Sequence, residues 1–197
     1  MKPAVLYASL LLAVASTSLF AQTTVTPPPR PTGSGTASGP TLEVTMKFIY
    51  DKLSDMGTVS YVLFAQDTKD GQTWSNSNSY TVTNVRADAA SCYIGYHGRG
   101  MRDGAVVSEQ DSGFYLKDVL DVVIEPEPQY FTEQSAGQGN PNIITNSTNP
   151  TLTALIVRRP KNVLNSFPIV DPTLADRLAK AITHAVELCG GGNKEPF

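Results

Sequence analysis

The chain has 197 residues, of which 17% are charged, and its formal net charge at pH 7 is −3. This mild acidity argues against general electrostatic binding to nucleic acid or to anionic membranes. Once the N-terminal segments described next are set aside, the length suffices for one ordinary hydrophobic core and not for two.

Residues 1–21 have the features of an export signal. Lys2 supplies a positive start, an apolar run rich in Leu, Ala and Ser follows from Leu6 to Leu19, and Ala21 is a small residue at the expected cut. The run is too short for a membrane span, which needs about 20 apolar residues. We therefore expect an exported protein, periplasmic or extracellular, with no transmembrane segment in the mature chain.

Residues 22–40 are predicted to be a disordered tether. They are rich in Pro, Gly, Ser and Thr and contain almost no bulky apolar side chain, so burial of apolar surface would not offset the conformational entropy lost on ordering them. A single α+β domain is expected over residues 41–197. It opens with a helix whose apolar residues recur every three or four positions, with Gly57 at its C-terminal end: Leu42, Met46, Ile49, Leu53 and Met56.

From Thr58 the period changes to two, which predicts strands. One runs from about Val59 to Ala65, with a turn at 67–71, a second covers 80–85, and a third includes Cys92, Ile94 and Tyr96. His97 is expected to end that strand, and Gly98-Arg99-Gly100 to form a strand-end turn. Asp103-Gly104 indicates a hairpin.

The stretch 114–124 predicts two short strands broken at Lys117-Asp118. Residues 125–150, rich in Pro, Gly, Asn, Gln and Ser, predict one long loop. Further strands are expected at 151–157 and 165–170. The tail is predicted to be an amphipathic helix capped by Asp171 and Pro172 and stopped by three glycines from Gly190. Its apolar face is expected to lie on the inner face of a strongly bent antiparallel sheet or barrel of about seven strands.

Cys92 and Cys189 are the only cysteines. In an exported chain they either form one disulfide or remain unpaired as two small, buried, apolar side chains. A bridge would close a loop of about 95 residues and would stabilise the fold by about 3–5 kcal/mol in the chain-entropy model.

No catalytic motif stands out in the sequence. The chain lacks a Gly-x-Ser-x-Gly elbow, a P-loop and an HExxH pattern, and neither His97 nor His184 has a partner at metal-ligand spacing. We therefore expect no catalytic residue, metal or cofactor, and a non-enzymatic domain that binds a protein, a peptide or a cell-envelope component. The binding candidates are Trp74, in a polar stretch, and the basic pair Arg158-Arg159.

Two alternatives remain. One is an enzyme of unrecognised type whose site is assembled from residues such as His97, Arg99, Asp118 and Asp121. The other is a small-molecule carrier that uses a barrel mouth lined by aromatic side chains, with an apolar pocket near Tyr93 or Phe114.

Two stretches resemble a group of uncharacterised secreted bacterial proteins: Leu42-Glu-Val-Thr-Met-Lys-Phe-Ile-Tyr-Asp-Lys-Leu53 and His184-Ala-Val-Glu-Leu-Cys-Gly-Gly-Gly-Asn-Lys-Glu-Pro-Phe197. This resemblance implies a single domain and no catalytic residue. The element order also resembles the pleckstrin-homology-like barrel, with residues 167–182 as the final strand, the turn and the helix that plugs one end. Such barrels are mainly binding modules, although a fold alone does not define a function.

Overall fold

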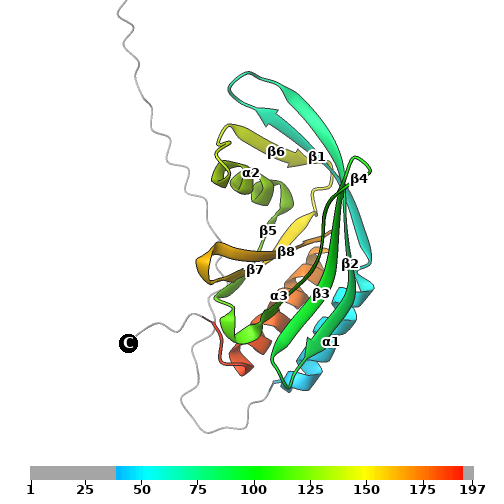
Figure 1. Ribbon diagram of the computed structural model, residues 1–197, viewed down its shortest axis with the longest axis vertical. Helices are drawn as coiled ribbons and strands as arrows, with labels where there is room; N and C mark the ends of the chain where they lie inside the picture. Colours follow the sequence, from blue (N-terminus) through cyan, green and yellow to red (C-terminus); the bar gives the residue numbers. More distant parts are fainter. Residues whose placement is uncertain (1–38, 193–197) are drawn as a thin grey trace, which may run out of the picture. The chain divides into compact units, whose positions relative to one another are not determined.

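The computed structural model describes residues 39–192, so the predicted export signal and nearly all of the predicted tether lie outside the described residues. The described part contains α1 (Leu42–Asp55), β1 (Thr58–Asp67), β2 (Thr73–Asp88), β3 (Tyr93–Arg102), β4 (Ala105–Tyr115), η1 (Leu116–Asp118), β5 (Asp121–Pro126), α2 (Glu127–Gly137), β6 (Ile143–Ser147), β7 (Thr153–Arg159), η2 (Pro160–Asn162), β8 (Val163–Ile169) and α3 (Pro172–Leu188) (Figure 1).

The strands form two antiparallel sheets. The larger has the order β4-β3-β2-β1-β6 and the smaller the order β5-β7-β8. The long strands of the larger sheet curve around the smaller sheet and α3 (Figure 1). The α+β class, the bent antiparallel sheet and the two terminal helices are therefore confirmed, whereas the closed barrel is not formed, because no strand pairing joins the two sheets within the described residues.

The predicted helices at the two ends of the domain are present. The predicted cap of α3 is confirmed, because the Asp171 carboxylate accepts from the Thr173 N–H at 2.9 Å, and Gly57, with a φ of 59°, follows α1 as predicted. Thr41, which the sequence analysis did not single out, caps the N-terminus of α1, where its hydroxyl accepts from the Val44 N–H at 3.4 Å. Both helices bury an apolar stripe that includes Met46, Ile49, Leu53, Leu178 and Ile182. The tail helix α3 packs mainly against α1 and the smaller sheet, which corrects the expectation that the bent larger sheet would be its principal partner.

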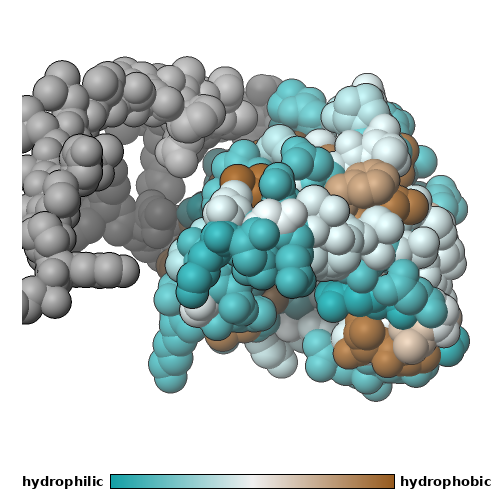
Figure 2. Space-filling model, turned by 90° about the horizontal axis from the view of Figure 1, so that it is seen from above, coloured by the Kyte–Doolittle hydropathy of each residue, from teal (hydrophilic) through white to brown (hydrophobic). Residues whose placement is uncertain are grey.

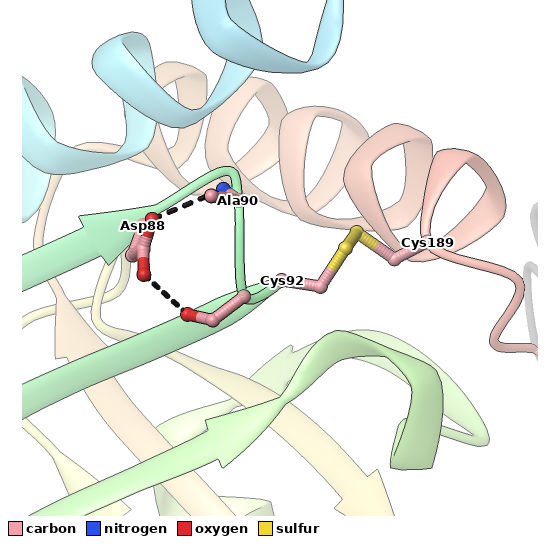
Figure 3. The surroundings of a disulfide bond; sticks show 5 residues. Asp88, Ala90, Cys92 and Cys189 are labelled. Carbon is pink, nitrogen blue, oxygen red and sulfur yellow. Dashed lines mark hydrogen bonds between the residues drawn. A yellow bond between two sulfur atoms is a disulfide. The ribbon is translucent and has the colours of Figure 1, made fainter.

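The C-terminal end of α3 is fixed by covalent and hydrogen bonds. Cys92 and Cys189 form a disulfide with their Cα atoms 6.0 Å apart, so the bonded alternative is confirmed (Figure 3). Cys92 lies just before β3 with a φ of 52°, and not inside the strand as predicted. Its turn is held by the Asp88 carboxylate, which accepts from the Ala90 N–H at 3.0 Å. A disulfide is consistent with an oxidising, exported environment.

The glycines after α3 complete this attachment. The Gly190 N–H donates to the Glu187 carbonyl and the Gly191 N–H to the Val186 carbonyl, which is the Schellman pattern of a helix C-terminus. The Gly192 N–H then donates to the Val119 carbonyl at 2.9 Å. A Cβ at position 191 would collide with the Leu116 carbonyl, so this glycine is required by a close backbone approach.

Two local predictions were wrong. The stretch 125–150 is not one loop, because it contains α2 and β6. It escaped detection because α2 buries only Glu127 among its residues and so has no apolar stripe. His97 and Gly98-Arg99-Gly100 lie within β3 and do not end it. The glycines there provide room for neighbouring side chains: a Cβ at Gly98 would meet the Tyr80 side chain, and one at Gly100 the Ser108 hydroxyl.

Candidate functional site

The strongest concentration of charged groups around a concave surface lies between α2 and one end of the smaller sheet. A pocket of about 550 Å³ opens there. The helix contributes Glu133, Gln134, Gly137 and Gln138, and the sheet with its connections contributes Leu120, Asp121, Arg158, Arg159, Asn162 and Leu164. We call this the α2 pocket. It contains both members of the predicted basic pair and Asp121 of the alternative enzyme set.

Strand register explains why these residues meet. Asp121 pairs with Arg158 across β5 and β7, and Arg158 pairs with Leu164 across β7 and β8. Directly paired residues point to the same side of a sheet, so the three side chains share one face. The β7–β8 turn reverses the chain with left-handed backbone at Lys161 (φ 64°) and Asn162 (φ 58°), which places Asn162 at the pocket wall.

The charged groups of the pocket are only loosely paired. Arg158 Nε lies 4.0 Å from Asp121 Oδ1, and Arg158 Nη2 lies 3.7 Å from Glu125 Oε1. Both separations exceed hydrogen-bond length. Asp121 Oδ1 and Arg159 Nε are buried atoms without a hydrogen-bond partner among the described residues. A buried polar atom left unpaired typically costs about 1–3 kcal/mol. Because these two atoms have almost no exposed surface, the charged groups that a ligand can reach are the partly exposed Arg158 and Asp121 side chains, which are 42% and 41% exposed.

A buried carboxyl group lies at the opposite end of α2. Glu127, the first residue of the helix, is only 3% exposed. The Tyr61 hydroxyl donates to its Oε1 at 3.4 Å, and its Oε2 has no hydrogen-bond partner among residues 39–192. Burial, helped by nearby Glu125 and opposed by the Tyr61 hydrogen bond, raises the pKa of Glu127 to about 8. The carboxyl is therefore protonated at neutral pH.

Glu125 links this buried end to the pocket. Its side chain is 12% exposed, and burial, followed by the charge of Glu133, raises its pKa, whereas Arg158 opposes that shift. A second polar link ties the two sheets: Asn165 donates to the Tyr96 hydroxyl and to the Ser112 hydroxyl, each at 2.9 Å. Burial raises the phenol pKa values of Tyr61 and Tyr80, so both remain protonated donors.

The histidine of the alternative enzyme set lies on the larger sheet. His97 Nδ1 is 2.9 Å from Asp111 Oδ1, and its Nε2 is 3.5 Å from Glu109. Arg99 faces the same Glu109 at 3.8 Å. The hydrogen bond that His97 donates to the Asp111 carboxylate is the main cause that raises the pKa of His97.

The other two members of that set are placed differently. Asp118 lies in η1 and Asp121 lines the α2 pocket. Among the described residues, no hydrogen bond or ion pair joins His97 or Arg99 to Asp118 or Asp121. The structure therefore brings His97 and Arg99 together with carboxylates of the neighbouring strand β4, and leaves the proposed set of four divided.

The remaining candidates lie outside the α2 pocket. Trp74 is 41% exposed at the start of β2, as its polar surroundings predicted. Phe114 is 1% exposed in the core, and Tyr93 packs against Tyr115 with ring centroids 5.0 Å apart. Neither of these aromatics lines the α2 pocket or a second, uncharged concavity of about 560 Å³ on β1, β2 and β3.

The surface at the end of the domain that carries α2, β6 and the β1–β2 hairpin is mainly hydrophilic. Figure 2 looks onto this end, and its apolar areas are separated by hydrophilic ones. The large apolar side chains exposed on these strands are Phe64, Trp74 and Ile144, at 44%, 41% and 45%. Recognition at this end of the molecule therefore has to rely largely on polar groups.

Sequence reasoning found Arg158, Arg159 and Asp121 of the pocket, but not Glu133 of α2 or the buried glutamates near the start of that helix. Glu125 and Glu127 stand in a Glu-Pro-Glu-Pro run that is typical of a loop. The usable signal was Pro128, since proline is favoured in the first turn of a helix. Burial of a carboxyl group, in contrast, has no signature in sequence.

Across residues 39–192, no group of three or more His, Cys, Asp or Glu residues is placed to hold a metal ion. The helices within that range are also too short or too polar to span a bilayer. Comparisons with protein-family models, with curated proteins and with solved structures found no match to this chain.

Proposed function

We propose that this chain is an exported, non-enzymatic domain that binds a peptide, or a peptide-containing component of the cell envelope, in the α2 pocket. The observation that carries the proposal is the charged lining of the pocket, in which Arg158 and Arg159 stand beside Asp121 and Glu133 and the partly exposed Arg158 lies beyond hydrogen-bond length from its carboxylate partners. A peptide offers carbonyl acceptors for the arginines and N–H donors for the carboxylates.

Three further features support binding as the role. The volume of about 550 Å³ lies within the range of about 300–1,000 Å³ usual for ligand sites. The lining includes no His, Cys, Ser or Thr among the described residues, so the side chains most used for nucleophilic attack are not part of it. The succession of a strand meander, a three-stranded sheet and a C-terminal helix also favours a pleckstrin-homology-like binding module, as part of the same proposal.

The test is selection of peptides on the mature chain. A library of random heptapeptides is displayed, enriched on the wild-type protein, and the winning peptides are synthesised and titrated by calorimetry. Arg159→Ala and Asp121→Ala are each expected to weaken binding by about 10- to 100-fold, the value of one hydrogen bond to a charged group. Arg86→Ala is the matched control, since Arg86 is exposed on β2 outside the pocket.

The proposal fails if no peptide is enriched, or if the selected peptides bind Arg159→Ala and Asp121→Ala as tightly as the wild type. Mass spectrometry of each peptide after incubation with the protein then distinguishes a binding role from an enzymatic one. Intact peptide supports a binding role, whereas turnover at the wild-type pocket, lost in Asp121→Ala, favours the alternative of an enzyme.

A further inference from the structure

Helix α2 forms one wall of the α2 pocket, yet few of its own side chains attach it to the smaller sheet. Glu127 is its only buried residue, and its N-cap residue Pro126 makes no side-chain capping bond. The hydroxyls of Thr132 and Thr145 lie 2.7 Å apart, and the Thr145 hydroxyl also donates to the Pro128 carbonyl, so the helix is tied to β6, the edge strand of the larger sheet. Towards the smaller sheet, α2 is held at its first residue, where the Glu127 N–H donates to the Leu152 carbonyl at 3.1 Å and the Glu127 side chain is buried. The position of α2 against the smaller sheet, which forms the other wall of the pocket, therefore depends strongly on the Glu127 end.

The surroundings of Glu127 stabilise its neutral carboxyl form relative to the ionised form. Tyr61 from β1 is its one hydrogen-bond partner, at 3.4 Å. Glu125 from β5 contributes a like charge, and Tyr130 from α2 itself is partly buried beside it. Arg102 of β3, a cation of the larger sheet, acts on the Tyr61 phenol and is not among the groups that shift the pKa of Glu127. An ionised carboxylate in this position would thus be buried beside a like charge, with one partner for two oxygens.

We propose that α2 is a proton-controlled wall of the α2 pocket: protonated Glu127 keeps the helix docked and the pocket formed, and loss of that proton releases the N-terminal turn of α2 and opens the pocket. The inference rests on the proposed function, because it assigns regulation to the same site. Once released, α2 also frays, because an isolated helix of 11 residues is only marginally stable in water. Gly139, with a φ of 88°, and the turn that follows α2 provide the hinge towards β6.

The consequence is a pocket whose open form becomes more populated as the surroundings change from neutral to alkaline. Ionisation favours the open form because the freed carboxyl titrates near the ordinary value of 4.5, whereas the docked one titrates near 8. Between about pH 6 and about pH 9.5 the opening equilibrium should rise by about 100-fold, as proton linkage between those two pKa values requires.

Hydrogen–deuterium exchange of the ligand-free full chain tests this directly. Protection of residues 127–137 is measured at about pH 6 and about pH 9.5 and corrected for intrinsic exchange rates, in the wild type and in Glu127→Gln. The wild-type helix should lose about 100-fold in protection, and the isosteric Gln variant should lose none. The amides of α3 (Pro172–Leu188) should keep their protection in both proteins, which separates local release from global unfolding.

The inference is overturned if α2 keeps its protection in alkaline buffer, if Glu127→Gln shows the same loss as the wild type, or if α3 loses protection together with α2. If Glu127→Gln does not fold, the wild-type comparison of α2 with α3 still decides between the outcomes. No peptide is present in this experiment, so its result does not depend on whether the pocket binds one, and failure of the peptide selection leaves it unchanged.

Discussion

Removal of the disulfide should lower the free energy of unfolding by several kilocalories per mole. Most of this loss should arise because the unfolded chain gains entropy, and little of it from changes in the native state. The perturbation is the double variant Cys92→Ala/Cys189→Ala. The two residues are 97 positions apart, and closing a loop of that length lowers the entropy of the unfolded chain enough to stabilise the fold by about 4.7 kcal/mol at 25 °C. For a domain of this size about 1 kcal/mol corresponds to about 2–4 °C, so the unfolding midpoint should fall by about 9–19 °C.

The native state should change little, because other bonds hold the same ends together. The Gly191 N–H still donates to Val186, and the Gly192 N–H still donates to Val119. The circular dichroism spectrum of the folded variant should therefore match that of the wild type. Urea and thermal unfolding followed by far-ultraviolet circular dichroism is the suitable assay, since Trp74, the sole tryptophan, is already 41% exposed in the fold and reports unfolding poorly.

The wild type unfolded in reducing buffer is the matched control, and it should behave like the double variant. A loss of less than about 1.5 kcal/mol would refute the loop-entropy reasoning, because it would mean that the unfolded chain is already compact without the bridge. A larger loss than about 6 kcal/mol, with an altered native spectrum, would place the effect in the folded state instead.

Four further predictions concern single residues. Gly191→Ala should destabilise the fold by about 1–3 kcal/mol in urea titrations, because the added Cβ meets the Leu116 carbonyl. Gly137→Ala is the control and should be neutral or stabilising, because Gly137 is helical and has open space around it. Equal destabilisation by the two substitutions would contradict the close approach at Gly191. Leu178→Ala should cost about 2–5 kcal/mol by the same assay because Leu178 is fully buried, and a loss below about 1 kcal/mol would mean that the core collapses around it. The free energy of unfolding should fall as the pH rises from 4.5 to about 8, by up to about 5 kcal/mol, because unfolding lets Glu127 ionise; the fall should vanish in Glu127→Gln. His97→Ala should leave the unfolding midpoint unchanged, and the NMR titration of His97 should have its midpoint above 6.5, returning towards that value in Asp111→Asn.

Much of the fold was predictable because most of its elements bury one face. The tail helix shows this best: Leu178 and Ile182 recur at helical spacing and are fully buried, and Asp171 caps the first turn as its position predicts. The predicted break at Lys117-Asp118 is also confirmed, because η1 lies there between β4 and β5. In both places the local pattern and the tertiary packing agree.

The elements that were missed or shortened bury little. The first half of β2, with Trp74 followed by Ser and Asn residues, is largely exposed and gives no alternation of apolar side chains, so only its second half was predicted. Helix α2 has a single buried residue, and that residue is a glutamate. The α2 pocket could not be predicted for the same reason. Arg158 and Arg159 are recognisable as a basic pair in the sequence, but Glu133 lines the pocket with them only because α2 forms, and no apolar periodicity predicts that helix.

The covalent link between Cys92 and Cys189 also divides the chain mechanically. Under tension applied at residues 39 and 192, the load would pass from one sulfur to the other and bypass residues 93–188. All the residues that line the α2 pocket, from Leu120 to Leu164, lie within that bypassed segment, whereas α1, β1 and β2 lie outside it. A domain pulled at its ends would therefore lose its first helix and two strands to stretching, while the strands and helix that build the pocket would bear no direct force.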